Sequence, residues 1–366
     1  MPELRNIAKI LLLCLFFCST SAFGRDLPVA RAVAARPDNR LAGSAQRPVG
    51  IRAIDSELAS GRDAYGFPIR VEEAPMRGMQ VPAKVAYAGV PSSIQASVEF
   101  LADSARLGRR FGTRGAVDAA FFVEHEFRQM GLKTTVDHFR AAGKVGHNVI
   151  GVRECPGASK YIVIMANFDG VGQYDSQVYP GADANASGVA AMLSLASSFT
   201  SPSTSGRYSG TPKYNLIFAG LDGHSESSAG AEELLAWLSA RGITLSSIAL
   251  AVNLDTMGSN LAPPQRYWKD YLIVLGGAKY EKSIASCNDG LGLHLYYDYY
   301  DSRAFTDMFY RRVGDQAVFV KRGVPAVMVT SGITMRTNKP NDDPASLSFD
   351  LLARRTELIR RWLLRF

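Results

Sequence analysis

Continuous apolar runs alternate with helical patterns from about residue 97 to the C-terminus. The run at residues 161–170 is nearly unbroken, which is typical of a strand buried on both faces of a sheet. We expect further strands within residues 134–139, 147–154, 214–223, 248–258, 271–277 and 317–332, and helices within 122–132, 188–199, 229–242 and 278–287. Strands that alternate with helices in this way predict an α/β fold, a three-layer α/β/α sandwich with a mixed, largely parallel central sheet.

The last segment, residues 349–366, has the spacing of an amphipathic helix. Its arginines lie away from an apolar face made of Leu351, Leu358, Ile359, Trp362, Leu363 and Phe366. We expect this face to pack on the core of the domain. The alternative is a helix that lies on a membrane surface.

The N-terminus has the order of a secretory signal peptide. Arg5 and Lys9 precede an apolar run at residues 10–18, and small residues follow it as far as Ala22. This run is shorter than the roughly 20 apolar residues of a membrane-spanning helix. We therefore expect residues 1–22 to be a cleaved signal peptide and the mature protein to be periplasmic or secreted, without a transmembrane segment. An uncleaved anchor is the alternative.

Composition adds an extension after the signal peptide. Residues 23–95 are rich in Ala, Arg, Pro and Gly and show no sustained period, so we expect a flexible segment there and a folded domain at residues 96–366. The chain carries a formal net charge of +7, but no interleaved aromatic and basic pattern accompanies it, so nucleic acid is not an expected partner. Export makes a disulfide between Cys155 and Cys287 possible, and the sequence leaves this pairing open.

Polar loops follow several of the predicted strands, and such loops form the functional crevice of an α/β sheet. Four of them span residues 165–170, 180–188, 221–230 and 253–259, and a fifth polar stretch spans residues 330–344. The second loop contains the segment GADANASG, in which Ala184 stands between polar residues.

These loops, with the lead-in at residues 105–139 and the phrase HNVIGV, resemble metallopeptidase family twenty-eight. This family comprises secreted co-catalytic zinc aminopeptidases, and its relatives include glutaminyl cyclases. The resemblance runs from about Ser97 to the C-terminus. It implies two zinc ions about 3.5–4 Å apart, held by two His, a bridging Asp, a Glu and a further Asp, with a second Glu as general base.

The resemblance places unusual residues at the first two of these positions. The first ligand His of the family corresponds to Asn167, and the acid that orients it is retained as Asp169. The bridging Asp corresponds to Ala184, which offers only a methyl group.

The remaining positions depart from the family in a similar way. His224 stands at the position of the general base, and Ser225 at that of the Glu ligand. Asp255 is the one family-type ligand that is kept, and the last ligand His corresponds to Asn338. An amide is a poor zinc ligand, and serine would have to lose its proton, so we expect no zinc or other cofactor. The other histidines of the mature chain lie away from these loops and are His125, His138, His147 and His294.

The polar side chains of the former site suggest a pocket formed by Asp169, Asp183, His224, Ser225, Asp255 and Asn338. Our first hypothesis is an exported pseudo-peptidase in which these groups hydrogen-bond one another and the pocket binds a peptide terminus or a small ligand. The alternative is an active exported metallo-aminopeptidase, or a hydrolase of divergent mechanism. New chemistry at this site could take three forms: a serine hydrolase with Asp222, His224 and Ser225, a lone acid/base at His224 beside Asp255, or a weak metal site of His224 with Asp183 and Asp169.

Overall fold

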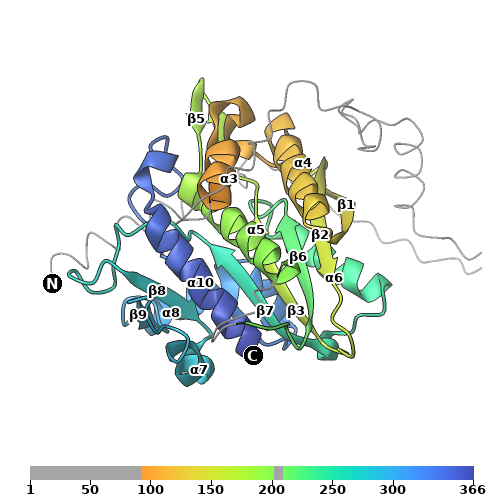
Figure 1. Ribbon diagram of the computed structural model, residues 1–366. Coiled ribbons are helices and arrows are strands. Elements are labelled where there is room, and N and C mark those ends of the chain that lie inside the picture. The colour runs from red at the N-terminus through yellow and green to blue at the C-terminus, as the bar shows by residue number, and fades with distance from the viewer. Residues whose placement is uncertain (1–91, 202–208) are drawn as a thin grey trace, which may run out of the picture. The chain divides into compact units, whose positions relative to one another are not determined.

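The computed structural model describes residues 92–201 and 209–366, and within them eight strands form one twisted mixed sheet. The sheet strands are β1 (Lys133–Ala141), β2 (Lys144–Arg153), β3 (Tyr161–Asn167), β6 (Asn215–Leu221), β7 (Ile248–Asp255), β8 (Tyr271–Leu275), β9 (His294–Tyr296) and β10 (Ala326–Thr330). They lie in the order β1-β2-β6-β3-β7-β10-β8-β9 (Figure 1). A separate small hairpin is formed by β4 (Gly172–Tyr174) and β5 (Gln177–Tyr179).

Four central strands, β6, β3, β7 and β10, pair in parallel. The β1–β2 hairpin is added antiparallel to β6, and β8 is antiparallel to β10. Every residue of β6, β8 and β10 is buried, as expected for apolar strands that are covered on both faces. The predicted mixed, largely parallel sheet is therefore confirmed.

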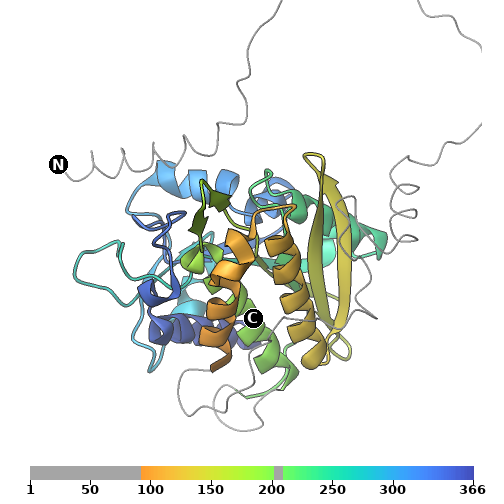
Figure 2. The ribbon, with the colours of Figure 1, turned by 90° about the horizontal axis from the view of Figure 1, so that it is seen from above.

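Helices cover both faces of this sheet. They are α3 (Ser92–Ala102), α4 (Arg114–Gln129), α5 (Ser187–Thr200), α6 (Ala229–Ala240), α7 (Glu281–Ala285), α8 (Arg303–Met308), α9 (Gln316–Lys321) and α10 (Phe349–Arg365). Figure 1 shows α3, α4, α5 and α10 over one face, where they share the larger apolar core, while α6 and α9 supply side chains to the core on the other face. Figure 2 shows the long β1–β2 hairpin beside α4.

The last helix packs on the core, as predicted from its apolar face. Leu351, Leu358 and Trp362 on α10 are each at most 2% exposed. No helix among the described residues is long and apolar enough to cross a membrane.

The start of the domain differs slightly from the predicted boundary at residue 96. Helix α3 already begins at Ser92, and Ile94 is buried in the larger core, so the last residues of the predicted extension belong to the folded domain. The predicted signal peptide and the rest of the predicted extension lie outside the described residues. Cys155 and Cys287 are both buried and free, so they do not form the disulfide that the sequence left open.

Candidate functional site

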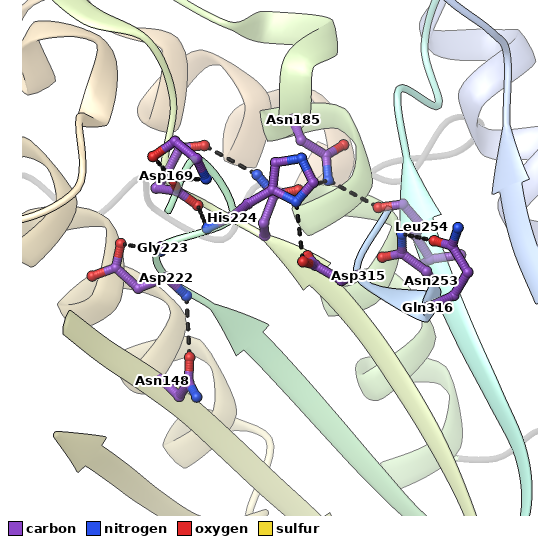
Figure 3. A network of polar contacts seen from close by, with 12 residues as sticks. Asn148, Asp169, Asn185, Asp222, Gly223, His224, Asn253, Leu254, Asp315 and Gln316 are labelled. Atoms are coloured by element: carbon purple, nitrogen blue, oxygen red, sulfur yellow. Dashed lines mark hydrogen bonds and ion pairs between the residues drawn. The ribbon is translucent and has the colours of Figure 1, made fainter. Parts of the chain in front are cut away.

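The parallel strands bring the predicted loops to one edge of the sheet. β3 ends at Asn167, β6 at Leu221 and β7 at Asp255, and the three strands run in the same direction. The loops that follow them therefore meet at their carboxyl ends, where such sheets place their functional crevice. Figure 3 shows the polar network formed there around Asp169 and His224.

Asp169 is the acceptor for three donors of the loop after β6. Its carboxylate accepts hydrogen bonds from the backbone amides of His224 and Ser225, at 3.0 and 3.2 Å, and from the Ser225 hydroxyl at 3.0 Å. Asp169 is 2% exposed, and this burial raises its carboxyl pKa, although the His224 charge and the two amides oppose the shift. The Ser225 hydroxyl is therefore engaged by Asp169.

His224 forms an ion pair with Asp315, a residue outside all the predicted loops. Its Nδ1 lies 3.0 Å from Asp315 Oδ1, and the two side chains are 28% and 1% exposed (Figure 3). Burial opposes a charged imidazole, but the carboxylates of Asp315, Asp255 and Asp169 outweigh it and raise the pKa of His224 to about 10. At neutral pH His224 is therefore an imidazolium.

The turn before α9 places Asp315 at this position. The next residue, Gln316, is buried, accepts a hydrogen bond of 2.8 Å from the Asn253 side chain on β7 and donates to the carbonyl of Phe309 at 2.8 Å. These bonds fasten the turn to the sheet beneath the site. Asp315 lies 91 residues from His224 in a stretch without a motif, so no pattern along the chain pointed to this pair.

Asp222, the third member of the serine-hydrolase hypothesis, has other partners. Its carboxylate accepts from the amides of His147, at 3.1 Å, and Gly223, at 2.9 Å. Since the Ser225 hydroxyl donates to Asp169 and His224 pairs with Asp315, the three residues do not form a Ser-His-Asp relay.

The loop that contains Ala184 is held by an acid from the fifth polar stretch. Asp342 accepts hydrogen bonds from the amide of Asp183 at 2.8 Å and from that of Ala184 at 3.1 Å. The Asp183 carboxylate turns inward: its Oδ1 accepts from the Gly258 amide at 2.7 Å and from the Ser187 hydroxyl at 3.1 Å, while its buried Oδ2 has no partner. Burial raises the carboxyl pKa of Asp183 to about 6 and that of Asp342 to about 7.

An amide network fixes the next residue of this loop. The Asn185 side chain donates to the Leu254 carbonyl at 2.9 Å (Figure 3). It also donates to Asn167 Oδ1 at 3.0 Å and accepts from the Thr256 amide at 3.0 Å. Asn167 in turn donates to the Asp169 carbonyl at 3.1 Å. Asn185 thus links its own loop to the loops after β3 and β7, and both ends of the Asn167 amide are bonded.

The two remaining predicted positions differ from each other. Asp255 is half-buried at the end of β7. Burial raises its carboxyl pKa and the charge of His224 lowers it, so the carboxylate of Asp255 lies close enough to His224 to interact with its charge. Asn338 is exposed, and within residues 92–201 and 209–366 its side chain forms no hydrogen bond to the other pocket residues. The structure therefore brings Asp169, His224, Ser225 and Asp255 together, whereas Asn338 lies at the surface.

A buried arginine joins two loops of this edge. Arg109 is fully buried, and its guanidinium donates to the carbonyls of Leu101, Phe168, Pro180 and Gly181 at 2.5 to 2.9 Å. Burial lowers its pKa to about 10, so it stays charged at neutral pH. The loops after β3 and before α5 are therefore held together by one side chain that the sequence did not single out.

The donors at this edge do not form a set that fits a two-zinc centre. Among residues 92–201 and 209–366, no three His, Cys, Asp or Glu side chains gather closely enough to hold a metal ion. The Ser225 hydroxyl is used by Asp169, and a protonated imidazole at His224 cannot bind a metal through the nitrogen that faces Asp315.

The sequence profile of peptidase family M28 matches residues 148–363, which include all of these loops. The chain belongs to peptidase family M28. The described fold agrees with this membership: the zinc aminopeptidase BSAP from Bacillus subtilis superposes with a TM-score of 0.59 at 12% sequence identity, over 78% of this chain and 96% of that one. A glutaminyl cyclase from Fimbriiglobus ruber superposes with a TM-score of 0.58 at 17% identity, over 77% and 98% of the two chains.

A curated relative matches part of this M28 protein. The alkaline phosphatase isozyme conversion protein of Escherichia coli (strain K12) is 28% identical over 172 residues. That stretch covers 41% of this chain and 47% of the relative, so the chain spans about half of the relative's length.

Proposed function

We propose that this chain is an exported M28 protein that works without zinc and whose former active-site pocket binds a peptide terminus or a small ligand. One observation carries the proposal: the polar groups at the carboxyl ends of β3, β6 and β7 form hydrogen bonds with one another instead of pointing together at a position that a metal ion could occupy. Ser225 bonds to Asp169, His224 pairs with Asp315, and Asn167 is bonded at both ends of its amide.

The family positions support the same proposal. The residues there are Asn167, Ala184, Ser225, Asp255 and Asn338, and only Asp255 is a zinc ligand of the family type. A single carboxylate cannot clamp two zinc ions. The side chain of Ala184 offers no ligand atom, but its backbone amide donates a hydrogen bond to Asp342. This bond holds the loop in place.

The charge on His224 decides whether this residue could replace the general base that the family has at this position. A general base must accept a proton from water, and a base is most effective when its pKa lies near the working pH. With a pKa raised to about 10, His224 is already protonated at neutral pH and can donate a proton but not accept one. This argues against a simple replacement of the family base by His224.

The family relationship suggests the ligand. BSAP is described as a zinc aminopeptidase, so the pocket of that fold accepts peptide ends, and a peptide terminus is the first ligand class to test here. The alternative function, an active hydrolase of divergent mechanism, would need a metal at Asp255 or new chemistry at His224.

The proposal is tested with aminoacyl p-nitroanilides incubated with the purified protein, with and without added zinc. We expect no release of nitroaniline above that of a buffer control. Turnover that is abolished by a chelator and by Asp255→Ala would instead support the metal-dependent alternative. Chelator-insensitive turnover that is lost in His224→Ala would support new chemistry at this site.

A further inference from the structure

Two histidines that lie outside the loops after β3, β6 and β7 face each other across the β1–β2 hairpin. His138 on β1 and His147 on β2 are direct partners in the antiparallel register, and their Nδ1 atoms lie 3.0 Å apart. The two rings are nearly perpendicular, at 87°, with centroids 4.9 Å apart. His147 is 6% exposed and His138 is half-buried, so the pair is sheltered and His138 is the more exposed of the two.

The separation of the two nitrogens sets the angle that a shared metal ion would see. With metal–imidazole bonds of about 2.0–2.1 Å, two nitrogens 3.0 Å apart subtend an angle of about 90°. This is the angle between neighbouring ligands in a square-planar or tetragonal Cu²⁺ site, whereas tetrahedral zinc requires a wider one. Imidazole nitrogen suits copper, and Cu²⁺ binds most strongly among the divalent first-row metals.

We propose that His138 and His147 form a two-histidine binding site for Cu²⁺, in which both Nδ1 atoms are ligands and water completes the coordination. Without the metal, one imidazole donates a hydrogen bond to the other across the same 3.0 Å. Binding therefore exchanges this hydrogen bond for two metal–nitrogen bonds, and the donor ring changes to the tautomer that carries its proton on Nε2.

The protonation state and the backbone favour this site. Burial and the neighbouring His138 lower the pKa of His147 to about 3, so the ring is neutral at neutral pH. The one Nδ1 proton of the hydrogen-bonded pair has to move to Nε2 of its own ring, or to solvent, before both Nδ1 atoms can bind the metal. The strand pairing is continuous from Lys133↔Val152 to Ala141↔Lys144, and the His147 amide is bonded to Asp222 at 3.1 Å. Ligands on paired strands are held more precisely than ligands on loops.

This site is separate from the proposed function. Neither histidine occupies a family ligand position, and both lie on the hairpin rather than on the loops after β3, β6 and β7. The copper site can therefore be present or absent whatever the former zinc pocket does.

The test uses the full-length protein, purified with a tag that contains no histidine and then stripped of metal. Cu²⁺ is titrated by calorimetry, and the loaded protein is examined by electron paramagnetic resonance. We expect one site with a tetragonal Cu²⁺ spectrum that shows coupling to two nitrogens. His138→Gln should weaken copper binding at least tenfold, while the matched control His125→Gln, on α4, should bind as the wild type does.

Three results would overturn the proposal. One is equal copper affinity in wild type and in folded His138→Gln. A second is copper binding that is lost with Asp255→Asn but kept in His138→Gln, which would place the ion in the former zinc pocket. The third needs no variant and applies even if His138→Gln does not fold: a wild-type spectrum without two-nitrogen coupling.

Discussion

His224 places a positive charge among carboxylates that have little access to water. Asp169 and Asp315 are 2% and 1% exposed, and Asp255 lies beside them at the end of β7. Buried carboxylates are costly unless a cation or hydrogen-bond donors compensate them. In a zinc enzyme of this fold the metal would provide that charge, and here the imidazolium of His224 can provide it instead.

This role predicts a pH dependence of stability. The pKa of His224 is raised from its ordinary 6.5 to about 10 in the folded state, so the ion pair stabilises the fold fully below pH 6.5 and is lost as the pH rises to about 10. The free energy of unfolding of the wild type should therefore exceed that of His224→Gln at pH 6 and approach it near pH 10. Urea unfolding at a series of pH values measures this difference.

Groups that do not interact with His224 are the same in both proteins and cancel in the comparison. Asp169 and Asp255 do interact with it, and the loss of the His224 charge raises their carboxyl pKa further in the variant. A difference between wild type and His224→Gln that stays constant from pH 6 to pH 10 would contradict a charged His224.

At this scale the sequence found some of the site and missed the rest. Asp169, His224, Ser225 and Asp255 could be predicted to meet because each directly follows or ends a strand of the parallel sheet. Asp315 and Asp342 could not, since their roles depend on turns distant in sequence from the groups they bind. The family resemblance assigns Asn338 to the position of the last ligand His, and in the structure this residue is exposed.

Several elements of this fold are joined by the buried side chain of Arg109. Arg109, at the end of the short helical segment Ser104–Arg109, donates to four carbonyls, of which two precede α5 and one follows β3. This buried arginine is tolerated because its donors are met by backbone acceptors and because the charges of Asp342 and Asp169 favour the guanidinium.

Replacing Arg109 with Met should therefore destabilise the protein strongly. The change leaves several buried carbonyls without donors, and we expect a loss of about 3–5 kcal/mol in the free energy of unfolding. Urea denaturation followed by circular dichroism gives the value. The matched control is Arg311→Met, since Arg311 is 60% exposed and its contacts are an exposed ion pair with Asp307 and a cation–π contact with the Tyr310 ring at 5.8 Å; its cost should stay within about 0.5 kcal/mol.

Equal destabilisation by the two substitutions would show that the Arg109 bonds do not hold these loops together.

Most elements of the sheet and its helices could be predicted from the sequence, whereas α9 and β9 could not. The strands at residues 161–167 and 215–221 and the helix α10 follow from unbroken apolar runs or a full amphipathic period. Helix α9 and strand β9 have only six and three residues, too few for a period to emerge. Their place is decided by packing against the rest of the sheet.

For the whole molecule, family membership and activity are separate questions. The M28 profile and the superposition with BSAP reflect the sheet, its helices and the loop order, which are retained. Catalysis would depend on a few side chains at one edge of that sheet, and these can change while the fold persists.

This separation predicts that one restored ligand will not restore activity. Ala184→Asp returns a carboxylate to the bridging position, but Asn167, Ser225 and Asn338 remain unchanged. We expect no aminoacyl p-nitroanilide turnover by this variant with added zinc. Measurable turnover would mean that the family positions have been assigned to the wrong residues.

The most direct measurement is the zinc content of the purified protein after exposure to zinc and removal of the excess. It should be made in the His138→Gln background, so that metal held by the histidine pair is not counted. We predict far less than one zinc ion per chain, determined by plasma mass spectrometry. Stoichiometric zinc that survives dialysis and is lost in Asp255→Ala would contradict the central claim that this M28 protein works without zinc.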